Sequence, residues 1–121
     1  MMNRMRHAAM IFGVTDQTQA VVESLCLDYL DALNTHFEQY PYLLEWHPSI
    51  GDFGLIAPMY AHLGRDPHPA KLMQQRAVSV HRWVERMNRY DEDVPEFFSA
   101  GADFVEDDDV PDSLITALRV L

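Results

Sequence analysis

Apolar residues recur at helical spacing over most of the chain and predict its helices. After Thr15-Asp16, either of which can supply a cap, a stripe returns every three or four residues as far as Tyr40. The stripe comprises Val22, Cys26, Tyr29, Leu33, His36 and Tyr40. Polar residues fall mostly off it, so the pattern predicts an amphipathic helix of about six turns. Pro41 ends this helix, because the residue before a proline avoids helical geometry.

The segment from residue 49 to residue 63 has a different pattern. Ser49 and Asp52 are spaced as a Ser-x-x-Asp capping box at a helix start, and no charged residue follows between Phe53 and Ala61. Because a surface helix normally shows a polar face, this pattern predicts a helix buried on nearly all sides. Pro58 predicts a kink, since proline removes one backbone hydrogen bond, and Gly64 predicts the helix stop.

Two more helices complete the pattern. Asp66-Pro67 supplies a cap and a first-turn proline for one helix, whose apolar stripe runs to Met87. Val110-Pro111 opens a last amphipathic run through Leu114, Ile115, Leu118 and Leu121, without a stop signal, as expected of a chain cut from a longer protein. No period-two strand pattern is found. The predicted fold class is therefore all-α, a helical bundle around the buried 49–63 helix.

The charge of the chain is concentrated in one segment. The 121 residues carry a formal charge of −10, and residues 91–112 hold ten acidic residues and no basic ones. With its prolines and glycine, this stretch predicts an acidic linker over 91–110, between a helical domain at 1–90 and a terminal helix at 111–121. The acidic balance argues against nucleic-acid and anionic-lipid partners.

Two further features bear on location. No stretch approaches the ~18 apolar residues of a membrane span. The short apolar run near the start has no small-residue cleavage site after it, and Cys26 is the only cysteine. We therefore expect a cytoplasmic protein that does not enter a membrane.

Candidate chemistry is sparse. Arg82, Arg86 and Arg89 share one helix face, which is either an anion-binding site or a solvated face that attracts the acidic segment. Four aromatic residues are candidates either for the core or for an apolar pocket between helices: Phe37, Tyr40, Tyr60 and Trp83. Histidine spacing and the acidic segment match no zinc or calcium motif, so no metal site is predicted. No nucleophile, phosphate-loop or paired-carboxylate motif is present, so no catalytic residue is predicted.

Four short motifs occur in a characteristic order. They are Pro41-Tyr42-Leu43-Leu44, the run from Pro48 to Leu55, Leu63 through Asp66-Pro67, and the run from His81 to Met87. As a set they resemble the C-terminal, all-helical domain of glutathione S-transferases over roughly residues 15–90. The resemblance implies that Ser49 and Asp52 form a structural capping box with no catalytic role. It also implies an apolar co-substrate pocket and part of a dimer interface.

The departures from that family affect function more than the matches do. In the family, a separate thioredoxin-like domain holds glutathione and activates its thiol, and this sequence has no strand pattern for one. The first helix of the family's helical domain is missing or reduced to residues 1–14. We therefore expect no cofactor, with glutathione bound only if a thioredoxin-like domain is supplied elsewhere. The expected partners are a second copy of the chain, a thioredoxin-like partner domain or a small apolar ligand.

Three functional hypotheses follow. The leading one is a helical domain that offers an apolar pocket and a docking surface and is not catalytic alone. The second is one half of an active glutathione transferase whose other half is a separate chain or was left out. The third is a non-catalytic protein-interaction module.

Overall fold

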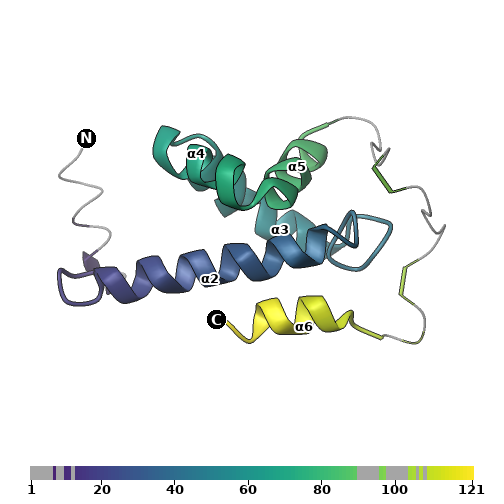
Figure 1. The fold of residues 1–121 in the computed structure, drawn as a ribbon, viewed down its shortest axis with the longest axis horizontal. Helices are drawn as coiled ribbons and strands as arrows, with labels where there is room; N and C mark the ends of the chain where they lie inside the picture. Colours follow the sequence, from purple (N-terminus) through teal and green to yellow (C-terminus); the bar gives the residue numbers. More distant parts are fainter. Residues whose placement is uncertain are drawn as a thin grey trace.

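The computed structural model describes residues 7, 10–11, 13–89, 96–97, 104–105, 107 and 109–121. This part of the chain is all-α (Figure 1). The helices, in order, are α2 (Gln19–Phe37), α3 (Ile50–Pro58), the π-helix η1 (Met59–Gly64), α4 (Pro67–Arg76), α5 (Val78–Met87) and α6 (Asp112–Leu118). Most of the first fourteen residues and most of the predicted linker at 91–110 lie outside the described ranges.

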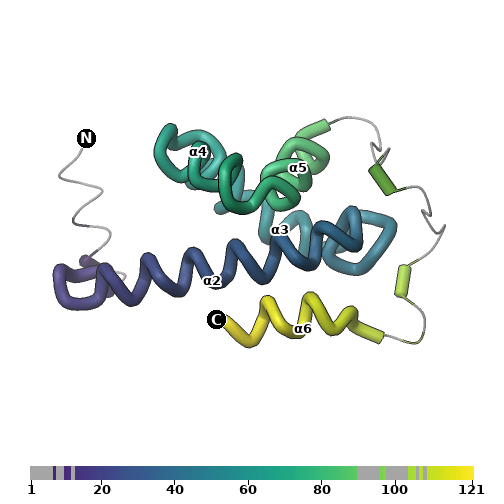
Figure 2. The backbone as a smooth tube through the Cα atoms, viewed as in Figure 1, coloured from purple at the N-terminus to yellow at the C-terminus, as the bar shows by residue number. Residues whose placement is uncertain are grey.

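The long helix α2 lies between two layers. Helices α3 to α5 lie on one side of it, where α5 packs against it, and α6 packs along the other side (Figures 1 and 2). The start of α2 differs from the prediction, since the helix begins at Gln19 with Thr18, and neither Thr15 nor Asp16, at the N-cap. The backbone N–H of Thr15 donates to the Thr18 hydroxyl at 2.8 Å, which holds the preceding turn outside the helix.

The core forms where these layers meet. Helix α2 contacts α5 across one interface and α6 across the other, and the apolar residues at these interfaces are almost fully buried. The buried set includes Leu30, Leu33, Phe37, Met73, Ala77, Val80, Trp83, Val84, Leu114 and Ala117. Cys26 and Tyr29 are half-buried against this cluster.

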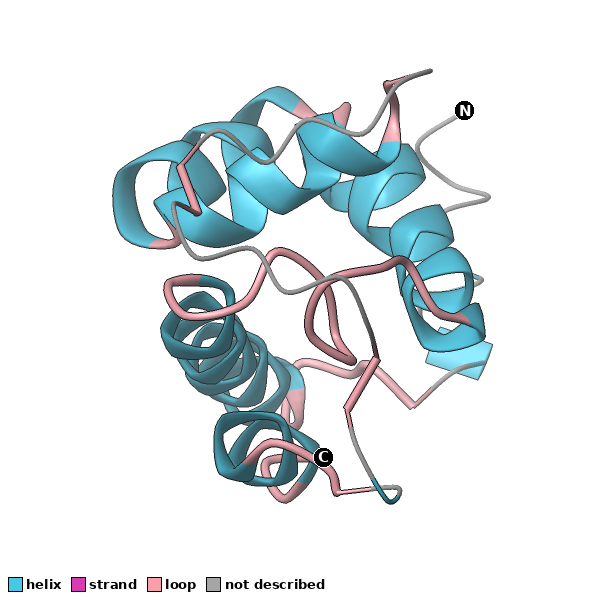
Figure 3. Ribbon diagram, turned by 90° about the vertical axis from the view of Figure 1, so that its right-hand side faces the viewer, coloured by secondary structure: helices cyan, strands magenta, loops and turns pink. Residues whose placement is uncertain are grey.

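The prediction that the 49–63 helix is buried on nearly all sides is wrong. In α3 and η1 only Asp52 and Met59 are buried, whereas Ile50 is 92% exposed, Phe53 61% and Tyr60 43%. Both elements lie at the edge of the bundle, where one side packs on α4 and α5. The large side chains on the opposite side are exposed, so an uncharged helix face is left in solvent. The described part of the chain consists of helices and loops (Figure 3).

Pro58 marks a change of helix type. The α-helical hydrogen bonding of α3 ends at Pro58 and continues as a π-helix over Met59–Gly64. A proline cannot donate a backbone hydrogen bond, which favours such a rearrangement of the turn around it. Gly64 ends the helix as predicted. A Cβ atom at position 64 would lie 3.1 Å from the Met59 carbonyl oxygen, so the turn suits glycine.

The single helix predicted from Pro67 to Met87 is two helices. Asp66 is the N-cap of α4 as predicted, but Ala77, at φ −129° and ψ 60°, separates α4 from α5. Two side chains of α2 hold this break. Asp31 accepts two hydrogen bonds from Arg76, at 2.8 and 2.6 Å, and the amide oxygen of Asn34 accepts one from the Ser79 N–H at 2.8 Å. These tertiary contacts override the local helical pattern.

His36 joins three parts of the fold. It is fully buried on α2, and its Nε2 lies 3.1 Å from the Tyr42 carbonyl oxygen, to which it donates. Its Nδ1 lies 2.8 Å from the hydroxyl of Ser113 on α6 and accepts from it when the ring is neutral. Burial lowers the pKa of His36 and outweighs the opposing effects of the Tyr42 carbonyl and the Asp52 carboxylate.

Acid should therefore destabilise the fold through His36. The unfolded chain takes up a proton near the ordinary histidine value of 6.5, whereas the folded chain resists it, so stability is complete above that pH. We expect the free energy of unfolding to fall as pH drops below 6.5 towards the lowered pKa. Urea titrations at several pH values measure this slope. His36→Gln should flatten it, and His62→Gln, at an exposed position, should leave it unchanged; equal slopes in all three proteins would contradict the assignment.

Candidate functional site

A buried carboxylate connects the motifs around α3. Asp52 is fully buried, and its Oδ2 accepts the backbone N–H of Ser49 at 2.8 Å and the Ser49 hydroxyl at 2.7 Å. The predicted capping box is present, with both of its halves formed. Oδ1 accepts two more hydrogen bonds, from the Leu43 N–H at 3.0 Å and from the indole N–H of Trp83 at 2.9 Å. Asp52 therefore fixes the 41–49 loop, α3 and α5 to one another.

The four aromatic residues proposed for an apolar pocket have different environments. Trp83 is fully buried in the core, where its ring stacks on Phe37 with centroids 4.9 Å apart. Tyr40 is half-buried beside the His36 ring, at 5.2 Å. Tyr60 is on the exposed face of η1, with the guanidinium of Arg65 5.9 Å from its ring centroid. An enclosed apolar pocket built from these four side chains is not formed.

The arginine face of α5 is only partly solvated. Arg82 and Arg89 are exposed, but Arg86 is buried, with 6% of its surface accessible. Its Nη1 donates to the Pro41 carbonyl oxygen at 2.8 Å, and its Nη2 donates to Glu96. The rings of Tyr42 and Phe97 flank the guanidinium at 5.8 and 5.3 Å. The predicted attraction of the acidic segment to this face is thus realised through Glu96.

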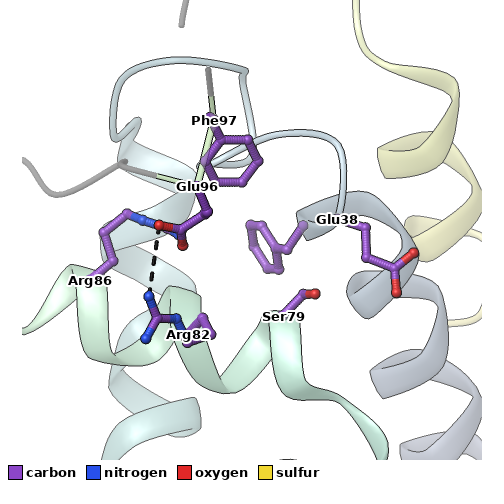
Figure 4. Close-up of a pocket in the computed structure, with 7 residues that line it drawn as sticks. Glu38, Ser79, Arg82, Arg86, Glu96 and Phe97 are labelled. Atoms are coloured by element: carbon purple, nitrogen blue, oxygen red, sulfur yellow. Dashed lines mark hydrogen bonds and ion pairs between the residues drawn. The ribbon is translucent and has the colours of Figure 1, made fainter. Parts of the chain in front are cut away.

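A pocket of about 280 Å³ lies beside this ion pair (Figure 4). It is lined by Phe37, Glu38, Ser79, Arg82, Arg86, Glu96 and Phe97, and we call it the arginine pocket. Glu96 Oε2 also lies 3.7 Å from Arg82 Nη2, so the carboxylate faces two guanidinium groups. Burial alone would raise the pKa of Glu96, but its backbone hydrogen bond and the two arginines lower the pKa overall. Glu96 is therefore an anion at neutral pH.

The second candidate site is the exposed apolar surface of α3 and η1. We call it the outer face, and its large side chains are Ile50, Phe53 and Tyr60. Between them lie small exposed residues, Gly54, Ala57 and Ala61, which would allow another backbone to approach closely. The only acidic side chain of α3 and η1, Asp52, is buried, so the outer face carries no formal negative charge.

The described residues contain no group of three or more histidine, cysteine, aspartate or glutamate side chains arranged to share a metal ion. His81 lies near Gln74 and Glu85, at 3.5 and 3.7 Å. Burial raises the pKa of the Cys26 thiol, which favours the uncharged form. No described helix has both the length and the apolar composition needed to cross a membrane.

Two important contacts could not be predicted from local patterns. Spacing identified Ser49 and Asp52 as a local pair, but the hydrogen bond from Trp83 crosses 31 residues and has no local signal. Glu96 is one of ten acids in its segment, and only the fold selects it for Arg86. Comparisons with known proteins add no constraint, because no family model, curated protein or solved structure matches the chain.

Proposed function

We propose that this chain is a docking domain of the kind found at the C-terminus of glutathione S-transferases, without catalytic activity of its own. The observation that carries the proposal is the outer face. Ile50 and Phe53 are two of the most exposed large apolar side chains in the described part, and they lie on a helix face without charge. Contiguous exposed apolar surface in a folded domain marks an interaction site.

The kinship proposal is supported by the buried carboxylate. Three of the four motifs that resemble the family meet at Asp52: Leu43 comes from the first, Ser49 and Asp52 from the second, and Trp83 from the last. Residues that recur together in a family often do so because they form one packed unit. Here the matching residues form one hydrogen-bonded unit that positions α3 and so presents the outer face.

Charge favours a different partner over a second copy of the chain. Two copies of a chain with a net charge of −10 repel each other at low salt. A neutral or basic partner would avoid this charge repulsion and would still bury the outer face. We therefore propose a thioredoxin-like domain as the partner, supplied by another chain or by another part of a longer protein.

Phe53→Glu is expected to abolish this docking without unfolding the chain, because the Phe53 side chain is largely in solvent. The chain is mixed with a purified thioredoxin-like domain from a glutathione transferase and followed by sedimentation velocity. Wild type should form a one-to-one complex, and Phe53→Glu should not. Leu118→Glu, which places the same charge at an exposed apolar position on α6, is the matched control and should bind like wild type.

Two outcomes would overturn the docking proposal. Self-association of the wild-type chain that Phe53→Glu abolishes would make a second copy the occupant of the outer face. Absence of any association would remove the outer face as an interface. The same preparations are assayed for glutathione conjugation, and we expect none from the chain alone; turnover by the pure 121-residue chain would favour the transferase hypothesis.

A further inference from the structure

We propose that the arginine pocket binds a small monocarboxylic acid with an apolar body, and that Glu96 occupies its carboxylate position as an internal ligand. This inference is independent of docking at the outer face, because the pocket is built from α2, α5 and residues 96–97. It concerns a different class of partner, a small molecule rather than a protein domain.

The guanidinium of Arg86 is fixed in place before any ligand arrives. One side of it is held by the Pro41 carbonyl oxygen, and its faces are flanked by the rings of Tyr42 and Phe97. Its Nη2 donates to the Glu96 carboxylate. A buried guanidinium needs an anionic partner, because an uncompensated charge in a low-dielectric environment is costly. The position taken by the Glu96 carboxylate is therefore an anion site.

The second guanidinium makes the site specific for a carboxylate. Oε1 of Glu96 bonds to Arg86, and Oε2 lies 3.7 Å from Arg82 Nη2, so each oxygen of one planar group faces its own arginine. Arg82 is half exposed, which allows its guanidinium to adjust to an incoming group. The two guanidinium groups supply charge on both sides of the carboxylate, and Arg86 Nη2 adds a directional hydrogen bond.

The rest of the pocket selects the body of the ligand. Phe37 and Phe97 contribute aromatic surface, while Ser79 and Glu38 line the side away from the ion pair (Figure 4). The carboxylate of Glu38 would repel a second negative charge on a ligand. A volume of about 280 Å³ accommodates a small aromatic or branched aliphatic acid. Aromatic monocarboxylates are therefore favoured over dicarboxylates and phosphates.

Glu96 is placed so that a ligand can replace it. Its side chain is 34% exposed, and it belongs to the segment with most of the chain's excess negative charge. A free carboxylate that enters the pocket would gain the same two arginine contacts and would release Glu96 to water. Binding of the acid and seating of Glu96 therefore compete for one position.

Phenylacetate and the uncharged phenylacetamide are the test probes, titrated by calorimetry into wild type and Glu96→Gln. Removing the competing carboxylate should tighten phenylacetate binding by about tenfold. Phenylacetamide should bind neither protein. The double variant Arg82→Gln, Glu96→Gln should bind phenylacetate about tenfold more weakly than the single variant Glu96→Gln does. Arg119→Gln, which removes an exposed arginine directly after α6, is the charge-matched control and should have no effect.

Equal phenylacetate affinity in wild type and Glu96→Gln would overturn the internal-ligand proposal. Equal binding of phenylacetamide would overturn carboxylate recognition. Arg86 is left unchanged because it also holds the Pro41 carbonyl, and circular dichroism checks that each variant folds. Phe53→Glu should bind phenylacetate like wild type, so failure of docking at the outer face and failure of this site remain distinguishable.

Discussion

Asp52→Ala should lower the free energy of unfolding by roughly 3 to 4 kcal/mol, a large part of the total for a small domain. The substitution removes an acceptor that serves four hydrogen bonds inside the protein. It leaves the Leu43 N–H and the Trp83 indole N–H buried without their acceptor, and each such donor costs about 1 to 3 kcal/mol. Urea-induced unfolding, followed by circular dichroism, measures the change.

Asp66→Ala is the matched control for Asp52→Ala. Asp66 also stands at a helix start, but it is exposed and its side chain makes no capping hydrogen bond. Its replacement should cost about 0.5 kcal/mol or less. If the two alanine variants unfold at the same urea concentration, then Asp52 contributes only an ordinary helix cap and does not hold the three segments together.

Trp83→Ala should cost about 4 kcal/mol, because it leaves a large cavity in the core. The indole is fully buried, stacks on Phe37 and donates to Asp52. Trp83→Phe keeps an aromatic ring beside Phe37 and loses the N–H donor, so it should cost about 1 to 2 kcal/mol. Thermal and urea unfolding of both variants give these values.

A double-mutant cycle tests the hydrogen bond between these two residues. Once Asp52 is alanine, the Trp83→Phe change no longer removes a hydrogen bond, and its cost should fall by about 1 kcal/mol. Strict additivity of the two changes would contradict an energetic link between the indole and the carboxylate. The cycle also separates this bond from the stacking on Phe37, which Trp83→Phe largely retains.

Local patterns predicted the helices well where the relevant interactions are local. The stripe of α2 and the Ser49–Asp52 box depend on residues three or four positions apart, and the Asp66-Pro67 start depends on two adjacent residues. The exposure of α3 could not be obtained in the same way. A helix without charged residues predicts burial of all its sides. The pattern does not identify the segment or partner that would bury them.

The arginine pocket shows the same limit for the candidate site. The face shared by Arg82, Arg86 and Arg89 was evident from helical spacing, and so was the acidic segment that follows. Burial of Arg86 against the Pro41 carbonyl depends on a contact across 45 residues. Helical spacing therefore identified the cationic groups, whereas the choice of Arg86 and Glu96 as the central pair required the tertiary structure.

The break at Ala77 has a consequence for the order in which the chain assembles. Helix α5 starts at Val78, and the side chain of Asn34, 45 residues earlier, satisfies the Ser79 N–H of its first turn. Until α2 is in place, nothing local favours ending one helix at Arg76 and starting another two residues later. Without α2, the stretch from 67 to 87 should thus favour one continuous helix. Packing against α2 would then produce the break between α4 and α5. We therefore expect the break at Ala77 to form only when α2 packs against this stretch.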